Sequence, residues 1–259
     1  MGNWLGKGLR ALLGLIPDGV AVPILQGPLR GKKWITGAHT HGVWLGSYEI
    51  DKQMSMMRCI RVGDVFFDVG ANTGFYSLFA SVLSGPGGRV VAIEPLPRNL
   101  AYIRRHVAMN GIDNVAIVGK AVSDRVGTAT FAVDGPATSR LAEGGSLTVE
   151  VTTIDEISRT LGIVPNVMKV DIEGAEIDML KGAREVLAKG RPVIFMSLHS
   201  GDLYGRLFPS AAGFGYRVLG LDGQPLDAGT FSDEAVLVPG EDRETAAILE
   251  SCSPRRRRG

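Results

Sequence analysis

The sequence predicts an α/β fold in which a doubly wound, mostly parallel sheet ends in an antiparallel strand pair. From Asp64 onward, short β-branched runs alternate with helical patterns, which is typical of a parallel sheet covered by helices on both faces. Each run is almost continuously apolar, as expected for strands that are buried on both sides.

The alternation defines the expected elements. The buried strands are 65–69, 89–94, 115–118, 167–171 and 193–198, and the antiparallel pair is 216–220 and 234–238. The helices are 75–83, 97–109, 175–187 and 201–213. Pro97 is a natural first-turn residue, and Asn110-Gly111 is a typical left-handed helix stop.

We expect three parts in the chain. Residues 1–62 form an N-terminal helical extension or cap, residues 63–240 form the main domain, and residues 241–259 form a flexible tail that includes the arginine run 255–258. Within the domain, strands 128–133 and 147–151 form a hairpin or lid near the ligand. Apolar residues recur at helical spacing between Leu5 and Ile16, but this stretch is shorter than the roughly 20 residues that span a bilayer, so no stable membrane insertion is expected.

Composition and charge exclude several classes of protein. Of 259 residues, 45% are hydrophobic and 21% charged, as in ordinary globular proteins. The formal net charge of +1 does not favour a nucleic-acid partner, which usually requires a basic face. Cys59 and Cys252 are too few for a disulfide framework and lack zinc-site spacing, so a cytoplasmic setting fits best. A homodimer remains an open alternative.

A glycine-rich turn follows the first buried strand. In open α/β sheets the ligand binds beyond the carboxyl ends of the strands, and the first strand-to-helix turn forms its floor. Gly70 permits the tight turn, and Gly74 lets the helix start close to the sheet. Asp68 would repel a pyrophosphate but suits the cationic groups of S-adenosylmethionine. The expected cofactor-binding residues of this turn are Asp68, Gly70, Ala71, Asn72, Thr73, Gly74 and Phe75.

Two later segments extend the expected cofactor site. The second strand ends at Glu94-Pro95, where an acidic side chain can bind both hydroxyls of a ribose. The alternative is that Glu94 only starts a helix. The third strand leads to Ala121 and Val122, small enough to border an adenine ring.

A second polar cluster ends the fourth and fifth strands. Lys169, Asp171 and Glu173 share one face of the strand because its side chains alternate, and charges on a buried strand are costly unless paired or used. Together with His199 they are the expected catalytic residues, which orient the acceptor or remove its proton. A purely structural ion pair of Lys169, and a helix-start role for Glu173, remain alternatives. Asp171 is also expected to contact the cofactor.

A divalent metal is a further alternative at this cluster. Two carboxylates and an imidazole, from Asp171, Glu173 and His199, suit such ions. Their spacing is not diagnostic, and we expect no metal.

The chain resembles the FkbM family of S-adenosylmethionine-dependent methyltransferases from about Gly63 to His199. The motifs that carry the resemblance are Asp68–Gly74, Ala92-Ile93-Glu94-Pro95, Ala121–Asp124, Thr152–Glu156 and, most specifically, Lys169-Val170-Asp171-Ile172-Glu173-Gly174-Ala175-Glu176. The resemblance implies a Rossmann-like class I methyltransferase fold. It also implies methyl transfer to an oxygen of a small-molecule acceptor, such as a sugar, a polyketide or another secondary metabolite.

One departure and four rival functions qualify this expectation. Family members often carry a glutamate where this chain has Ser197, which puts the acceptor type in doubt. N-methylation of a small molecule or peptide, and a non-catalytic cofactor-binding protein, remain alternatives. A nicotinamide-dependent oxidoreductase is disfavoured because the turn lacks the Gly-x-Gly-x-x-Gly spacing. A nucleic-acid methyltransferase is disfavoured by the neutral charge and the absence of an Asn-Pro-Pro-Tyr-like motif.

Overall fold

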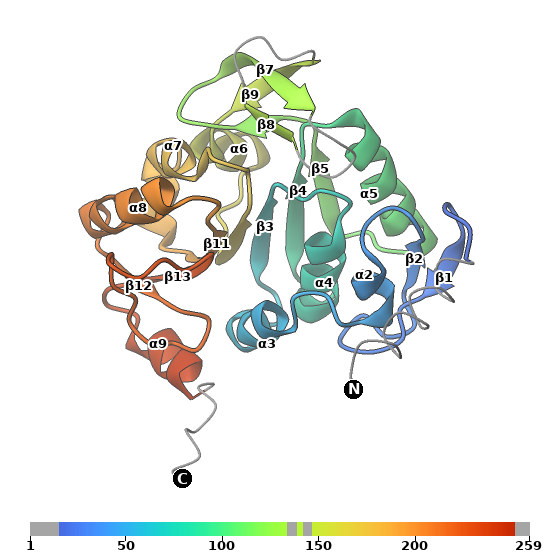
Figure 1. The fold of residues 1–259 in the computed structure, drawn as a ribbon, viewed down its shortest axis with the longest axis horizontal. Coiled ribbons are helices and arrows are strands. Elements are labelled where there is room, and N and C mark those ends of the chain that lie inside the picture. Colours follow the sequence, from blue (N-terminus) through green and yellow to red (C-terminus); the bar gives the residue numbers. More distant parts are fainter. Residues whose placement is uncertain (1–15, 134–138, 142–146, 252–259) are drawn as a thin grey trace, which may run out of the picture.

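A seven-stranded sheet forms the centre of the molecule (Figure 1). The computed structural model describes residues 16–133, 139–141 and 147–251. The strand order is β12-β13-β11-β10-β3-β4-β5. In chain order these strands are β3 (Val65–Val69), β4 (Arg89–Ile93), β5 (Val115–Val118), β10 (Val167–Val170), β11 (Val193–Ser197), β12 (Tyr216–Leu219) and β13 (Glu234–Pro239).

The predicted fold class is confirmed by the strand pairing. The strands from β11 to β5 are parallel to their neighbours, whereas β13 runs antiparallel between β11 and β12. Each of these strands begins and ends within one residue of its predicted bounds. The reason is that a strand buried on both faces is apolar along almost its whole length, which makes it easy to recognise in the sequence.

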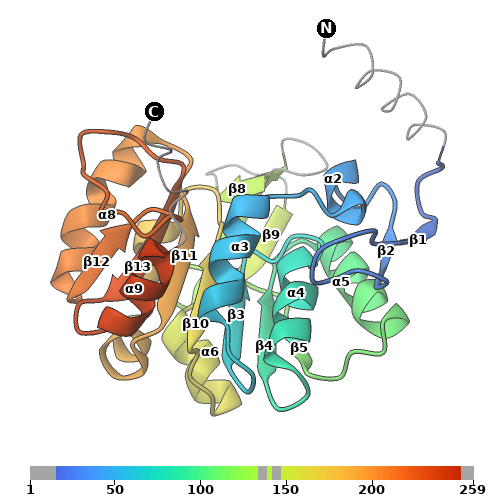
Figure 2. The ribbon, with the colours of Figure 1, turned by 90° about the horizontal axis from the view of Figure 1, so that it is seen from below.

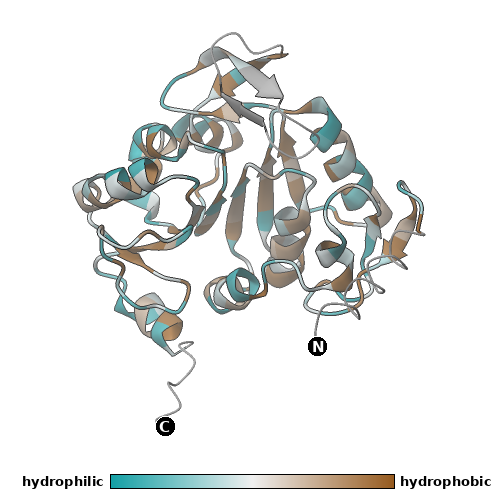
Figure 3. Cartoon of the chain, viewed as in Figure 1, coloured by the Kyte–Doolittle hydropathy of each residue, from teal (hydrophilic) through white to brown (hydrophobic). Residues whose placement is uncertain are grey.

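Helices cover both faces of the sheet. On one face, α6 (Ile154–Leu161), α7 (Glu176–Lys181) and α8 (Gly201–Gly213) pack against alternate strand residues such as Phe67 and Val69. On the other face, α3 (Ile50–Cys59), α4 (Phe75–Ser84) and α9 (Arg243–Glu250) share a core with Phe66. Figure 2 shows these last three helices side by side in front of the sheet. Hydrophobic residues accordingly concentrate along the central strands (Figure 3).

The helix expected at 175–187 is interrupted. It ends with α7 at Lys181, and a short π-helical turn, η1 (Val186–Gly190), follows. The break lies at Gly182, which passes so close to the carbonyl of Ser123 that a Cβ atom there would collide with it. The Gly182 carbonyl accepts a hydrogen bond from Asp155 N (3.0 Å).

A smaller sheet lies beside the edge of the main sheet (Figure 1). Its strand order is β6-β9-β7-β8, with β6 (Ala121–Val122), β7 (Gly127–Val133), β8 (Ser139–Leu141) and β9 (Leu147–Thr152). The antiparallel pairing of β7 with β9 confirms that the two predicted strands pair, and β8, which was not predicted, lies between them in sequence and pairs with the other edge of β7. The action of this hairpin as a lid stays a prediction.

The N-terminal part contains more than the expected helices. A hairpin of β1 (Ala21–Pro23) and β2 (Lys33–Ile35) precedes α2 (His41–Leu45) and α3, and β2 packs against α5 (Pro97–Met109). The leucines of the first 13 residues lie outside the described residues. In the part of the chain that is described, no helix is both long and apolar enough to cross a bilayer.

The C-terminal expectation of a flexible tail from residue 241 is wrong for residues 243–250. These residues form α9, and the side chain of Asp242 caps the helix by accepting a hydrogen bond from Thr245 N (2.9 Å). Leu249 is fully buried between α9 and the sheet core. The amphipathic pattern of this helix holds it against α3. The arginine run lies outside the described residues.

Candidate active site

The turn after β3 is built by residues in left-handed conformations. The φ angles of Gly70, Asn72 and Gly74 are 76°, 49° and 90°. A Cβ atom on Gly70 would collide with the carbonyl oxygen of Asp171, so only glycine fits between the turn and the end of β10. The N–H groups of Gly70 and Ala71 both donate to Ile93 O (3.0 and 2.9 Å), which ties the turn to β4.

This turn forms one side of a large cavity at the carboxyl ends of β3, β4 and β10. The cavity has about 870 Å³ of space, including the part open to solvent. Most of the predicted cofactor residues line it: Gly70, Ala71, Asn72, Thr73, Phe75, Glu94, Pro95, Ala121, Val122 and Asp171. Lys169 and Glu173 line it as well. Asp68, Gly74 and His199 are not among its lining residues.

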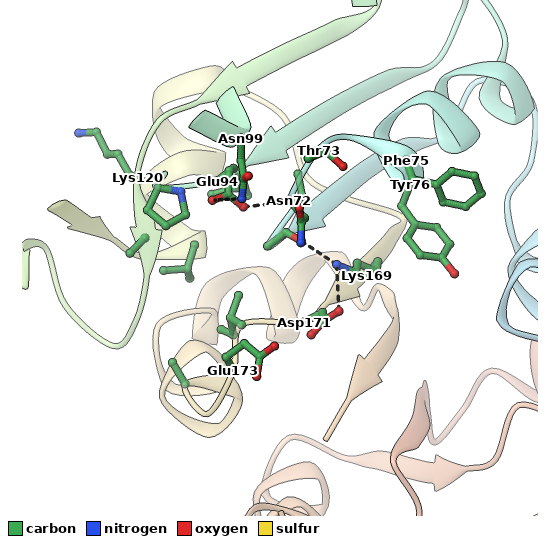
Figure 4. A pocket seen from close by; sticks show the side chains of 18 of the residues that line it. Asn72, Thr73, Phe75, Tyr76, Glu94, Asn99, Lys120, Lys169, Asp171 and Glu173 are labelled. Carbon is green, nitrogen blue, oxygen red and sulfur yellow. Dashed lines mark hydrogen bonds and ion pairs between the residues drawn. The ribbon is translucent and has the colours of Figure 1, made fainter. Parts of the chain in front are cut away.

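Glu94 is held rigidly inside the cavity. Its Oε2 accepts a hydrogen bond from Asn72 N (2.8 Å), and its Oε1 accepts from Leu96 N (2.9 Å) and Asn99 Nδ2 (3.2 Å). Burial raises the pKa of this carboxyl group to about 7, against the opposing effect of these donors. Figure 4 shows Glu94 beside Asn99 and Asn72. Each carboxylate oxygen has two lone pairs, so Oε2 retains capacity for a ligand hydroxyl.

An apolar region of the cavity adjoins Glu94. Ile93, Pro95, Ala121 and Val122 line it, and the Val122 and Ala121 side chains are almost fully buried. Lys120 also lines the cavity and is paired with Glu150 (2.8 Å) at its exposed edge. An adenine ring fits an apolar region of this kind, which we call the apolar slot, next to the groups that bind its ribose. The donor set and the apolar slot together fit S-adenosylmethionine.

Asp68 lies beneath the cavity and does not line it. This position corrects the sequence-based expectation that Asp68 contacts the cofactor directly. Its side chain is fully buried, accepts a hydrogen bond from Ser77 Oγ (2.6 Å) and lies 3.7 Å from Lys169 Nζ. Burial raises the pKa of the Asp68 carboxyl group. Because Lys169 Nζ donates to Gly70 O (2.7 Å), Asp68 supports the cofactor turn through Lys169.

Gly74 likewise shapes the site without lining it. A Cβ atom there would approach the Ile103 side chain to 3.2 Å, so this glycine lets α4 start close to α5. The sequence predicted a close approach of this helix start to the sheet, whereas the close neighbour of Gly74 is α5.

The second cluster comes together at the ends of β10 and β11. His199 Nε2 lies 2.9 Å from Asp171 Oδ1, and His199 Nδ1 lies 3.7 Å from Glu173 Oε2. Asp171 Oδ2 also lies 3.6 Å from Lys169 Nζ. Figure 4 shows Lys169 between the cofactor turn and Asp171. Glu173 is held at a φ of 53°, an uncommon conformation for a residue with a side chain.

The charges of this cluster follow from its pairing. The hydrogen bond to Asp171 raises the pKa of His199 to about 9, so the ring is protonated at neutral pH. Burial opposes ionisation of Asp171, but Lys169 and His199 outweigh it and hold its pKa well below the usual range. A protonated His199 has no ring nitrogen free to accept another proton.

Asp171, Glu173 and His199 present ligand atoms within 4.8 Å of one another, a set that is able to hold a divalent ion. The proton on His199 already neutralises part of the negative charge, and Lys169 supplies a second cation beside Asp171. A metal ion would have to displace the proton against this arrangement.

The N-terminal part was expected to form a cap, but the sequence analysis did not identify the residues by which this part lines the cavity. His39 and Tyr48 line the cavity, and their rings pack edge to face with centroids 4.9 Å apart. His39 Nδ1 is buried and has no hydrogen-bond partner among the described residues. Burial lowers the pKa of His39, so its ring is neutral at pH 7. Tyr76, also a lining residue, donates from its hydroxyl to Glu49 Oε2 (2.7 Å).

The chain belongs to the class of S-adenosylmethionine-dependent methyltransferases, whose cofactor sits at the carboxyl ends of such a sheet. It is a member of the FkbM methyltransferase family, because the model of the methyltransferase FkbM domain matches residues 68–218, more than half of the chain. This confirms the predicted family, the Rossmann-like class I fold and the cofactor.

Two curated relatives illustrate the family. The chain is 28% identical over 142 residues to the hexuronic acid methyltransferase AglP of Haloferax volcanii, covering 53% of this chain and 57% of the relative. It is 27% identical over 207 residues to the 31-O-demethyl-FK506 methyltransferase FkbM of Streptomyces tacrolimicus, covering 66% and 79%. The match thus spans little more than half the length of the archaeal relative.

A solved structure shows the same fold. The S-adenosylmethionine-dependent O-methyltransferase of Thermotoga maritima matches with a TM-score of 0.50 and 13% identity, over 91% of this chain and 83% of that one.

Proposed function

We propose that the protein transfers a methyl group to a hydroxyl group of a small-molecule acceptor, such as a sugar or a polyketide. The observation that carries the proposal is the ionised Asp171 at the cavity wall, between Lys169 and His199. A carboxylate held in this way accepts a hydrogen bond from a hydroxyl and fixes the direction of its oxygen. The named acceptors of the two curated relatives, a hexuronic acid and an FK506 precursor, support the same class.

The cavity offers separate places for the cofactor and the acceptor. Glu94 and the apolar region around Ala121 would bind the ribose and adenine, and the carboxylate of Asp171 would attract the cationic end of the cofactor. When bound there, S-adenosylmethionine would supply the methyl group and leave as S-adenosylhomocysteine, while the acceptor oxygen gains the methyl group and passes its proton to a base. The acceptor then occupies the part of the cavity near Glu173, His39 and Tyr48.

His39 is the proposed proton acceptor. Its ring is neutral near pH 7 because burial lowers its pKa, whereas His199 is protonated by its pairing with Asp171. His199 and Glu173 then orient the acceptor from the rim. General bases contribute about 10²- to 10⁴-fold in rate when they are positioned on the reacting group.

A panel assay tests the proposal. Purified protein is given labelled S-adenosylmethionine with hydroxylated sugars and polyketides, each paired with its deoxy analogue, and transferred label is located by mass spectrometry. Label on the oxygen of a hydroxylated compound, absent with its deoxy partner, is the expected result. Label on nitrogen, or no transfer to any panel member by protein that binds S-adenosylhomocysteine, contradicts the proposal.

A matched pair of histidine variants tests the base. His39→Gln should lower the transfer rate at least about 100-fold while affinity for S-adenosylhomocysteine stays near wild type. His41→Gln is the control, because His41 is close in sequence but bonds to Trp44 Nε1 (3.2 Å) and does not line the cavity. Equal rates in the two variants contradict the assignment of His39.

A further inference from the structure

A buried histidine joins the cofactor turn to the N-terminal hairpin. His106 lies on α5 and is completely buried. Its Nδ1 lies 2.8 Å from the carbonyl oxygen of Thr73, which lines the cofactor cavity. Its Nε2 accepts a hydrogen bond from Ile35 N (3.1 Å), in β2. One imidazole ring thus touches both the turn and the hairpin.

These two partners fix the state of the ring. Thr73 O can only accept a hydrogen bond, and Ile35 N can only donate one. The neutral form with its proton on Nδ1 satisfies both partners, and the other neutral form satisfies neither. Burial lowers the pKa of His106 to about 4, in agreement with a neutral ring. The Trp34 ring, also fully buried, stacks on the imidazole at a centroid distance of 3.8 Å.

Neighbouring hydrogen bonds also tie the free edge of β2 to α5 and the residue that follows it. The side chain of Asn110, which follows α5, accepts from Lys33 N (2.7 Å) and donates to Lys33 O (2.9 Å). The backbone N–H groups of residues 33 and 35 point to the same edge of β2, because the backbone of a strand alternates with a period of two residues. Their N–H groups, which would otherwise lie unpaired, are therefore satisfied by two side chains one turn apart on the helix.

We propose that His106 is a positioning residue that couples the cofactor turn to the N-terminal part. Binding of S-adenosylmethionine and packing of the N-terminal part against α5 are then one cooperative event. The same N-terminal part supplies His39 and Tyr48 to the cavity wall. Packing of the N-terminal part against α5 therefore completes the acceptor side of the cavity. The inference depends on the cofactor and not on the proposed acceptor.

Two substitutions separate the two hydrogen bonds of His106. In His106→Asn, the amide nitrogen takes the place of Nδ1 and still reaches Thr73 O, but nothing accepts from Ile35 N. In His106→Gln, the amide oxygen takes the place of Nε2 and accepts from Ile35 N, but nothing donates to Thr73 O. Both variants lose the ring that stacks on Trp34, so each serves as the other's control.

Calorimetry with S-adenosylhomocysteine gives the expected order. His106→Gln should bind it on the order of tenfold more weakly than wild type, because a buried carbonyl in the turn loses its donor. His106→Asn should stay within about threefold. Equal affinities for both variants, whether reduced or at the wild-type level, would show that His106 only stabilises the fold and would overturn the proposal.

Hydrogen exchange on the wild-type protein tests the coupling without any variant. Saturating S-adenosylhomocysteine should slow exchange of the Ile35 amide together with the amides of the turn, because both depend on the position of His106. Slower exchange in the turn with unchanged exchange at Ile35 would overturn the coupling. Failure to bind S-adenosylhomocysteine at all would instead contradict the cofactor.

Discussion

The affinity for the cofactor should depend on pH through Glu94. A ribose hydroxyl donates to the ionised carboxylate, whereas the free protein holds this group at a pKa of about 7 because it is buried. Binding must therefore release a proton when the pH lies below 7. The apparent dissociation constant rises by the factor 1 + 10^(pKa − pH), which is about 100 at pH 5 and close to 1 at pH 8.

Calorimetry with S-adenosylhomocysteine between pH 5 and pH 8 measures this factor. Affinity should fall about tenfold per pH unit below 7, and heats in buffers of different ionisation enthalpy should show uptake of one proton by the buffer at pH 6 or below. Glu94→Gln should bind more weakly at pH 8 but with a nearly flat pH profile. A flat profile in the wild type, or the same slope in the variant, would refute the link between Glu94 and binding.

Three further outcomes follow from the geometry of the site. The His199 ring should titrate near pH 9 by NMR and at least one unit lower in Asp171→Asn, since its main partner loses its charge; an unchanged titration in that variant contradicts the pairing. In the wild-type protein, the pairing of protonated His199 with Asp171 stabilises the folded state fully below about pH 6.5. This stabilisation is lost as the pH rises through 9. Gly70→Ala should weaken S-adenosylhomocysteine binding more than tenfold, because it combines a positive φ with a collision, whereas Gly87→Ala, with open space around its Cβ position, should bind as wild type. Dialysis against EDTA should leave affinity and transfer rate unchanged, and restoration of a lost activity by Mg²⁺ or Mn²⁺ would show that the cluster at Asp171 holds a metal.

The sheet could be predicted because its signal is local. Strands such as β3 and β10 are apolar except for one charged residue each, Asp68 and Lys169, and each stands between segments with helical spacing. The break after Lys181 left no such signal, because its cause is the contact between Gly182 and the Ser123 carbonyl, which lies far away in sequence. A glycine within a helical pattern is compatible with continuation of the helix.

The residues of the candidate site likewise fall into those that the sequence indicated and those that it did not. Residues of the turn from Gly70 to Thr73 are contiguous and carry a family motif, so the sequence indicated them together. His39 and Tyr48 lie in the loops before and after α2, and the hairpin that precedes them is hydrogen-bonded to His106 and Asn110. No spacing in the sequence reports such a contact. Asp68 shows the converse, since the motif is present but its carboxylate is fully buried beside Lys169 and does not line the cavity.

The structure explains the surroundings of Ser197, which stands where family members often carry a glutamate. Ser197 of β11 pairs directly with Glu234 of the antiparallel strand β13, and its hydroxyl donates to Glu234 Oε1 (3.2 Å). Lys52 of α3 donates to Ser197 Oγ (2.9 Å) and forms ion pairs with Glu234 and Glu49. A carboxylate is therefore present beside position 197, supplied by the neighbouring strand, because directly opposite residues in an antiparallel pair bring their side chains to the same place. In this chain the Glu234 carboxylate is paired with the buried Lys52, so a substitution at position 197 has to be interpreted together with the residue opposite it on β13.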